Sequence, residues 1–174
     1  MTAQPEYALY KPGGTPVTSP RPDIQIRDAT AMDAGALAGV LATRGGSVDD
    51  HRVVAARLHE SLAVLKVAEV GDTLSGWSGA GERAIHPRSA PAWLIAGLTV
   101  IPQHRRQGIA TRLLDAVTGE IRTHHPGAPI FSVVNARNLA SIDLHVQQGF
   151  FEIERGPSFA RISFAGGEGV LLRT

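Results

Sequence analysis

Residues 101–117 read IPQHRRQGIATRLLDAV, and they join an apolar run to an amphipathic helical pattern. Arg105, Arg106 and Gly108 stand immediately before the helical part. A helix N-terminus already carries partial positive charge and usually favours acidic residues. Positive charge and a bare backbone at this position therefore indicate that an anion such as phosphate binds there. The alternative is that Gly108 only eases a tight turn and that the arginines are solvated.

The segments on either side predict a strand–loop–helix unit. Residues 93–100, WLIAGLTV, form an apolar run of strand length, which is typical of a buried central strand. A helix is expected from Gly108 to about Thr123. Its predicted buried stripe consists of residues four apart: Ile109, Leu113, Val117 and Ile121. The unit lacks the G-x-x-x-x-G-K-[ST] pattern of a P-loop, so we do not expect it to bind a nucleoside triphosphate.

The rest of the chain predicts one α/β domain on a mixed sheet. Residues 1–22 are rich in Pro, Gly, Ser and Thr and are expected to form a flexible tail, with the folded domain spanning 23–174. Strands are predicted near 23–30, on both sides of the turn Gly71-Asp72 and at 129–134; helices at 31–43, 47–62 and 138–148; and two or three further strands after Gly149.

The composition argues against several classes of function. Hydrophobic residues make up 43% and charged residues 19% of the chain, as in globular domains. The net charge of +1 and the scattered basic residues do not favour binding to nucleic acid or to a membrane. The absence of cysteine excludes disulfides, thiolate nucleophiles and Cys-based zinc sites. We therefore expect a cytoplasmic protein without a metal.

Two segments resemble the acyl-CoA motifs of the GNAT N-acetyltransferases. In the first, Arg105, Gly108 and Ala110 occupy the defined positions of Q/R-x-x-G-x-G/A. In the second, residues 138–150, NLASIDLHVQQGF, are similar to N-x-x-A-x-x-L-Y-x-x-x-G-F. The resemblance covers the chain from residue 23 onward and implies the GNAT-like α/β fold. That fold has a mixed, mostly antiparallel sheet of about six to seven strands, flanked by about four helices.

The resemblance implies transfer of an acetyl group from acetyl-CoA to an amine by direct attack in a ternary complex. The residues expected to bind the coenzyme are Leu98, Thr99 and Val100 through the strand backbone, Arg105, Arg106, Gln107, Gly108, Ile109, Ala110 and Thr111 at the helix N-terminus, and Asn138 and Ser141 in the second motif. The rival interpretation is a non-catalytic acyl-CoA-binding sensor with the same fold. The acceptor is expected to be a small-molecule or peptide amine, and homodimers are common in the family.

His145 is the expected catalytic residue, because the family's tyrosine at this position commonly protonates or hydrogen-bonds the departing thiolate. Helical spacing places Asn138, Ser141 and His145 on one polar stripe. A neighbouring apolar stripe is predicted to face the core: Leu139, Ile142 and Val146. Two simpler alternatives stay open, namely that His145 only lines the cleft and that Asn138 caps the helix.

The general base is not evident from the sequence. An attacking amine must be neutral, so its ammonium form has to lose a proton before or during attack. The apolar strand at 93–100 carries no carboxylate, although many relatives supply one there. Glu69, Glu82 and His86 are candidates, and a surface salt bridge or a solvated loop explains each of them more simply.

Overall fold

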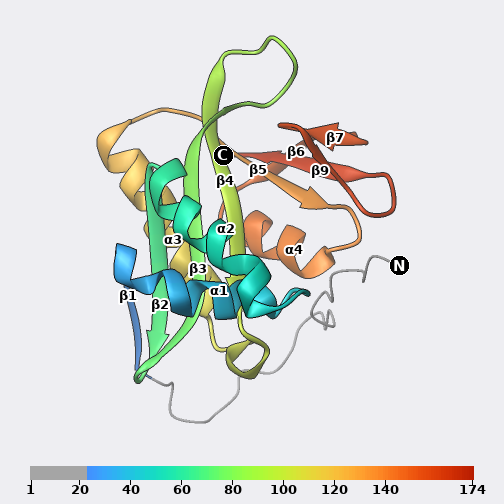
Figure 1. Ribbon diagram of the computed structural model, residues 1–174. Coiled ribbons are helices and arrows are strands. Elements are labelled where there is room, and N and C mark those ends of the chain that lie inside the picture. The colour runs from blue at the N-terminus through green and yellow to red at the C-terminus, as the bar shows by residue number, and fades with distance from the viewer. Residues whose placement is uncertain (1–22) are drawn as a thin grey trace.

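The computed structural model describes residues 23–174, so the tail predicted at residues 1–22 lies outside the described residues. The helices are α1 (Ala34–Ala42), α2 (Val48–Ser61), α3 (Ile109–His124) and α4 (Leu139–Gln147) (Figure 1). The strands are β1 (Ile24–Asp28), β2 (Val64–Val70), β3 (Thr73–Ala84), β4 (Pro91–Val100), β5 (Ile130–Asn135), β6 (Phe151–Gly156), β7 (Ser158–Phe159), β8 (Ile162–Ser163) and β9 (Gly169–Arg173). All predicted elements are present, and four strands rather than two or three follow α4.

One sheet holds seven of the strands, in the order β1-β2-β3-β4-β5-β9-β6. The expected mixed, mostly antiparallel sheet is confirmed, because β4 and β5 are parallel and every other neighbouring pair is antiparallel. Parallel neighbours need a crossover connection, and α3 supplies it. The short strands β7 and β8 pair with each other in a separate ribbon.

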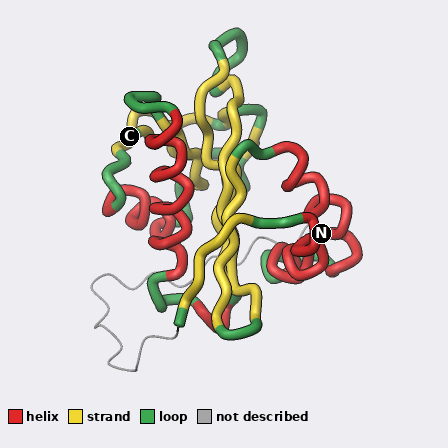
Figure 2. The backbone as a smooth tube through the Cα atoms, turned by 90° about the vertical axis from the view of Figure 1, so that its left-hand side faces the viewer, coloured by secondary structure: helices red, strands yellow, loops and turns green. Residues whose placement is uncertain are grey.

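Helices cover both faces of the sheet (Figure 2). On one face, α1 and α2 pack over a cluster that includes Leu37, Val67 and Trp77. On the other face, α3 and α4 pack over a second cluster, with Leu114 from α3 and Ile130 from β5. The central strands are therefore buried on both sides, which explains the nearly continuous apolar sequence of β4.

Local sequence accounts for two of the helices. The predicted apolar stripe of α3 is confirmed, since four side chains are each at most 1% exposed: Ile109, Leu113, Val117 and Ile121. Helix α2 begins at the N-cap Ser47, whose hydroxyl accepts a hydrogen bond from the backbone N–H of Asp50 at 3.2 Å. The Asp50 carboxylate accepts in return from the Ser47 N–H at 2.9 Å, which completes a capping box.

The predicted apolar stripe of α4 is wrong at two of its three positions. Leu139 and Val146 are each 52% exposed, and only Ile142 packs against the core. The polar face turns inward instead, because His145 is buried and hydrogen-bonds Ser132 of β5. Successive residues lie about 100° apart around a helix, so a sheet-facing His145 turns Leu139 and Val146 toward solvent.

Candidate functional site

A gap opens in the sheet between β4 and β5. The two strands pair only from Trp93 opposite Ile130 to Ile95 opposite Ser132. Beyond these residues β4 continues to Val100, while β5 pairs along its other edge with β9. Among residues 23–174, the backbone groups that the two strands turn toward each other beyond this point have no strand partner. Such groups need other hydrogen-bond partners, and an extended ligand can provide them.

An irregularity in β4 lies where the gap begins. Gly79 of β3 opposes Gly97, and the next residue, Ala80, opposes Ile95. Ala96 is therefore left without a partner on β3, which is the pattern of a β-bulge. A bulge bends its strand and increases the local twist, so it directs the end of β4 away from β5.

The gap belongs to a cleft of about 450 Å³. Its lining comes from residues 95–98 of β4, residues 132–135 of β5, Asn138, Ser141 and His145 of α4, residues 162–165, and Arg44 in the loop after α1. Four residues predicted from the sequence therefore line one cleft: Leu98, Asn138, Ser141 and His145. Within the part of the chain that the structure describes, no carboxylate lines this cleft, and Arg44 is its one permanently charged side chain.

Three other predicted residues lie farther along, toward the start of α3. Thr99 is 5% exposed, and its hydroxyl has no hydrogen-bond partner among residues 23–174. Val100 packs against the cluster that contains Ile109, whose side chain is 1% exposed. Ile109 can therefore present only its backbone to a ligand.

No side chain in the described part of the chain caps the N-terminus of α3. Its N-cap residue, Gly108, has a φ of 83°, and a Cβ at this position would have no described atom within 4 Å. The first hydrogen bond of the helix joins the Arg112 N–H to the Gly108 carbonyl at 3.1 Å. The N–H groups of Ile109, Ala110 and Thr111 consequently lack helical acceptors. With no acidic residue in the first turn, this end is suited to an anion.

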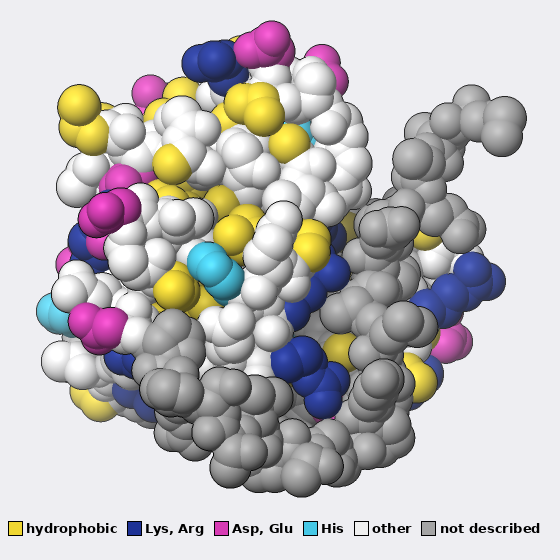
Figure 3. Space-filling view, turned by 90° about the horizontal axis from the view of Figure 1, so that it is seen from below, with side chains coloured by type: hydrophobic (Ala, Val, Ile, Leu, Met, Phe, Trp, Pro, Cys, Tyr) yellow, Lys and Arg dark blue, Asp and Glu magenta, His cyan; other side chains and the backbone are white. Residues whose placement is uncertain are grey.

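Basic and amide side chains surround this helix start, and Lys and Arg side chains gather on the face that Figure 3 views from below. The Nε of Arg105 donates to the Val100 carbonyl at 3.0 Å, which fixes this side chain at the end of β4. Arg106 has a φ of 67°, in the left-handed region that non-glycine residues adopt rarely. The Oε1 of Gln107 is buried without a hydrogen-bond partner in the described chain. The predicted residues 105–111 thus form one compact, positively charged end.

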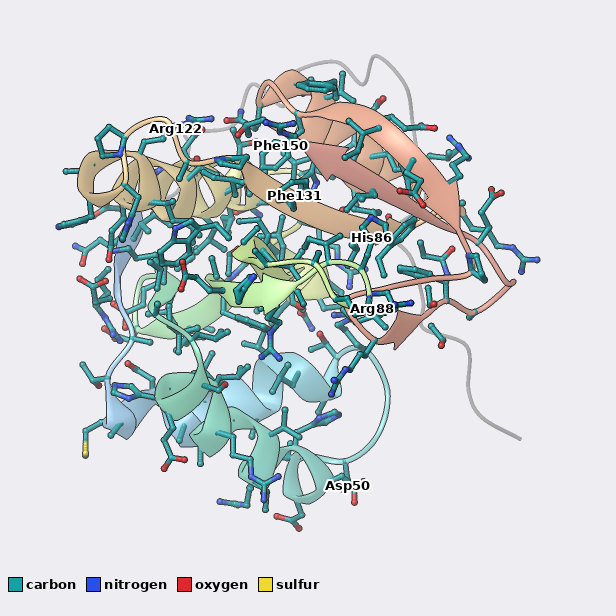
Figure 4. All side chains as sticks on the ribbon, turned by 90° about the horizontal axis from the view of Figure 1, so that it is seen from above. Asp50, His86, Arg88, Arg122, Phe131 and Phe150 are labelled. Carbon is teal, nitrogen blue, oxygen red and sulfur yellow. The ribbon has the colours of Figure 1, made fainter. Side chains whose placement is uncertain are left out.

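His145 is the most buried titratable side chain of the cleft, at 2% exposure. Its Nδ1 lies 2.7 Å from the Ser141 carbonyl, and its Nε2 lies 2.9 Å from the Ser132 hydroxyl. Burial lowers the pKa of His145, and the hydrogen bond to Ser141 offsets only part of that effect. Phe150 packs edge-on against the ring at 5.1 Å, so the imidazole is held on three sides. Figure 4 labels Phe150 and also Phe131, the β5 residue next to Ser132.

The three candidate bases lie outside the cleft lining. Glu69 accepts hydrogen bonds from Arg27. Glu82 lies on β3 and is exposed. His86 lies in the loop between β3 and β4, where its Nε2 is 3.3 Å from a Glu154 carboxylate oxygen (Figure 4). Nothing in these positions brings any of the three to the gap between β4 and β5.

Sequence reasoning missed several residues of the cleft. Ser132 gave a usable signal, because it is the one polar residue of the run IFSVV at 130–134. Gly97 gave none: a Cβ there would lie 2.6 Å from the Trp77 indole, and that contact exists only in the folded sheet. Arg44 reaches the cleft from a loop that carries no motif.

Two further observations concern residues 23–174 as a whole. They contain no cluster of three or more His, Asp or Glu side chains arranged to hold a metal ion. None of their helices is both long enough and apolar enough to cross a membrane.

Comparison with known proteins adds independent information. The sequence matches the model of the acetyltransferase (GNAT) family over residues 41–150, which is more than half of the chain. No curated protein matches. One similar solved structure is a ribosomal-protein-alanine N-acetyltransferase from Brucella melitensis, with a TM-score of 0.68 and 22% identity; the match covers 86% of this chain and 98% of that one. A second is a phosphinothricin acetyltransferase from Sinorhizobium meliloti in complex with acetyl-CoA, with a TM-score of 0.67 and 18% identity; the match covers 87% of each chain.

A third similar structure is yncA from Salmonella typhimurium, a putative acetyltransferase with its cofactor acetyl-CoA. Its TM-score is 0.66 at 20% identity, and the match covers 87% of this chain and 93% of that one. At these identities the structural likeness shows a shared fold. It agrees with the family match and confirms the fold expected from the sequence.

Proposed function

This chain belongs to the acetyltransferase (GNAT) family, and from that premise we propose that it transfers an acetyl group from acetyl-CoA to a primary amine by direct attack in a ternary complex. Family membership supports acetyl transfer in general, and two of the similar structures contain acetyl-CoA. The acceptor, the order of binding and the residues that act are the proposed part.

One observation carries the proposal: the unpaired edge of β4 leads from the cleft to the uncapped N-terminus of α3. Acetyl-CoA has a phosphate-rich end and an extended amide-containing arm, and it supplies an acetyl thioester at the tip of that arm. The N–H groups between Arg105 and Thr111 suit the pyrophosphate, and the open space at Gly108 lets oxygen approach the backbone. The backbone of residues 98–100 suits the amides of the arm.

The proposed binding mode sets the position of the reacting end. From Val100 back to Ile95 the strand spans roughly 17 Å at the usual rise per residue. The thioester then reaches the closed end of the gap, near Ser132 and His145, and Asn138 and Ser141 face the arm from α4. In this arrangement the chain's residues bind the phosphates, align the arm and exclude water from the reacting carbonyl.

Thermal unfolding with and without acetyl-CoA tests the binding mode. At about 100 times the dissociation constant, binding adds about 2.7 kcal/mol to the unfolding free energy. For a domain of this size Tm should rise by roughly 5–10 °C. ATP serves as the control ligand and should give a much smaller rise.

Two glycine variants separate the site from backbone strain. Gly108→Trp should abolish the rise, because the side chain fills the approach to the helix N-terminus. Gly127→Trp is the matched control: Gly127 has a φ of 81°, against 83° at Gly108, and a Cβ there would likewise have no described atom within 4 Å. Gly127→Trp should therefore be strained to a similar degree and keep the rise. A rise that survives in Gly108→Trp contradicts the proposed phosphate site.

Release of free thiol distinguishes the enzyme from the sensor. The sensor stays a candidate because no carboxylate lines the cleft among the described residues. We would incubate the protein with acetyl-CoA and one of four amines: an alanine-terminated peptide, phosphinothricin, a lysine-containing peptide or spermidine. The first two are suggested by the names of similar structures. Thiol release that depends on one amine supports the enzyme, and binding without turnover supports the sensor.

A further inference from the structure

Ser132 and His145 form a hydrogen-bonded pair at the closed end of the cleft. Ser132 is the last residue of β5 that pairs with β4, opposite Ile95, and His145 lies on α4, thirteen residues later in the chain. Both residues line the cleft, and both are nearly buried, at 3% and 2% exposure. The pair therefore lies at the position where the proposed binding mode places the thioester.

The neighbouring groups define which atom of this pair donates the hydrogen bond and which accepts it. The Ser141 carbonyl can only accept, so the His145 Nδ1 at 2.7 Å from it carries the ring proton. In the neutral ring Nε2 then has a lone pair, and the Ser132 hydroxyl donates to it at 2.9 Å. The serine oxygen keeps its own lone pairs for a group in the cleft. A hydroxyl, a histidine and a group that orients the histidine form the arrangement by which proteins activate a hydroxyl.

Among the described residues that line the cleft, His145 is the one side chain that can accept the proton of the attacking amine. Among the described lining residues the titratable side chains are Arg44 and His145, and an arginine does not deprotonate in proteins. The candidate bases outside the cleft lie on other elements, as described above. A neutral, buried imidazole with its lone pair directed at a cleft hydroxyl is suited to accept a proton briefly and to give it back.

We propose that Ser132 and His145 form a proton relay that serves both halves of acetyl transfer. As the amine nitrogen bonds to the carbonyl carbon, one of its protons passes to the Ser132 oxygen while the Ser132 proton passes to His145 Nε2. As the carbon–sulfur bond breaks, the same two transfers run in reverse, and the proton ends on the sulfur of coenzyme A. One carbon–nitrogen bond forms, one carbon–sulfur bond breaks, and the pair returns to its starting state.

The relay differs from acylation of the serine. In serine hydrolase triads a carboxylate stabilises the imidazolium while the serine attacks. Here the third group is the neutral carbonyl of Ser141, which stabilises the imidazolium less. Transient protonation is therefore favoured over a lasting acetyl-serine. This inference rests on the proposed function and assigns a role to Ser132 that no sequence motif carries.

Nuclear magnetic resonance of the ring nitrogens tests the pair in the free protein and with added coenzyme A. At pH 7 the His145 ring should be neutral with its proton on Nδ1. Ser132→Ala should shift the Nε2 resonance and leave the tautomer unchanged. Ser75→Ala is the control, because it removes a serine hydroxyl that hydrogen-bonds another histidine, His104, outside the cleft. A proton on Nε2, or a charged ring at pH 7, overturns the relay.

Kinetics test whether the pair acts as a unit. The acceptor is whichever of the four amines wild-type protein acetylates. Ser132→Ala and His145→Gln should each lower kcat about 100-fold or more with little change in the KM for acetyl-CoA. Because the two residues share one proton path, the kcat of the double variant should lie within about threefold of the kcat of the less active single variant. Ser75→Ala should stay within about twofold of wild type.

The outcomes separate the relay from the proposed function. Turnover by wild type with equal turnover by Ser132→Ala overturns the relay and leaves acetyl transfer intact. Losses that multiply in the double variant also overturn it, since they indicate two independent, structural effects. An acetyl group found on Ser132 of wild type by mass spectrometry replaces the relay with a covalent mechanism. Failure of wild type with every amine overturns the proposed function and the relay with it, whatever the resonances show.

Discussion

Two serine–histidine pairs in this protein are hydrogen-bonded in opposite directions: the serine is the donor in one pair and the acceptor in the other. In the cleft, the Ser132 hydroxyl donates to His145, whose other nitrogen donates to a backbone carbonyl. Near the start of β3, the Ser75 hydroxyl donates to the Thr73 carbonyl at 2.8 Å. A hydroxyl has one proton, so Ser75 must accept from the His104 Nδ1 that lies 2.7 Å away.

The position of the carbonyl decides between the two arrangements. A carbonyl next to the histidine directs the ring proton toward itself and leaves a lone pair for the serine. A carbonyl next to the serine takes the hydroxyl proton and makes the histidine the donor. The first arrangement creates a proton acceptor and lines a cleft, whereas Ser75 is not among the lining residues. Two residue types at hydrogen-bonding distance therefore do not define a function without the third group.

The largest expected difference between the pairs follows from replacing each serine by cysteine. The thiol of Ser132→Cys should lose its proton to His145 and attack the thioester of acetyl-CoA, because a thiol has a reference pKa near 8.5, far below that of a hydroxyl. The expected result is one covalent acetyl group with release of coenzyme A. Mass spectrometry of the intact protein detects it, and the natural chain contains no cysteine that would confuse the result.

Ser75→Cys is the matched variant and should remain unmodified. His104 donates to this position rather than accepting from it, and the position does not line the cleft. Equal acetylation of both variants would show nonspecific thiol reactivity and break the comparison. No acetylation of either would mean that the thioester does not reach Ser132.

Removing each histidine should have the next largest effect, on stability. His145→Phe leaves the buried Ser132 hydroxyl without its acceptor, and an unsatisfied buried group costs about 1–3 kcal/mol. Tm should fall by roughly 3–10 °C. His104 is partly exposed, so water can replace its hydrogen bond, and His104→Phe should lower Tm by less. Thermal unfolding of both variants measures the difference.

A second substitution sharpens this result. Replacing both partners of a buried hydrogen bond by apolar groups is close to neutral, whereas removing one is costly. The double variant Ser132→Ala/His145→Phe should therefore unfold at a higher temperature than His145→Phe alone. A further fall in Tm would indicate that packing, and not the unsatisfied hydroxyl, causes the loss.

The N-caps of α4 and α2 allow the same comparison between a residue in the cleft and one outside it, with a smaller expected effect on stability. Asn138 accepts from the Ser141 N–H at 3.2 Å and lines the cleft, and Ser47 caps α2 away from it. Asn138→Ala and Ser47→Ala should each cost about 1 kcal/mol of stability. Only Asn138→Ala should also reduce the rise in Tm that acetyl-CoA produces. A reduced rise in Ser47→Ala would show that general loss of stability weakens binding.

The smallest expected effect concerns pH. Burial lowers the pKa of His145 in the folded state, whereas the unfolded histidine titrates at about 6.5. As pH falls below about 6.5, the unfolded chain takes up a proton on this histidine before the folded protein does. The free energy of unfolding should therefore fall as pH falls through this range and should not change from this cause at higher pH. Urea unfolding at pH 7.5 and 5.5 measures this slope. His145→Gln should flatten it, and an unchanged slope in this variant would contradict the assignment to His145.

The elements of this fold could be predicted because their signals are local. Residues four apart mark the buried face of α3, and Ser47 with Asp50 marks the start of α2. The glycine at 108 and the arginines before it mark the positively charged start of α3 within a few residues. Each of these signals acts through neighbours within one helical turn, so no knowledge of the rest of the chain is needed.

The orientation of α4 could not be predicted in the same way. Its sequence offers a polar stripe and an apolar stripe, and periodicity favours burial of the apolar one. In the folded protein Ser132 provides the partner that lets His145 face the sheet, and Leu139 and Val146 turn outward as a result. A buried polar side chain becomes acceptable once its hydrogen bonds are satisfied, and those partners lie on another element.

By itself, the sequence determined the order of strands and helices, the two family motifs and the positively charged start of α3, since all of these arise from short-range spacing. Only the tertiary structure decided where β4 leaves β5, because the bulge at Ala96 depends on its register with β3. It also decided which groups hydrogen-bond the His145 ring, namely a carbonyl one turn away on α4 and a hydroxyl from β5. A proton path is set by distances between atoms, and the distance between β5 and α4 exists only after the chain has folded.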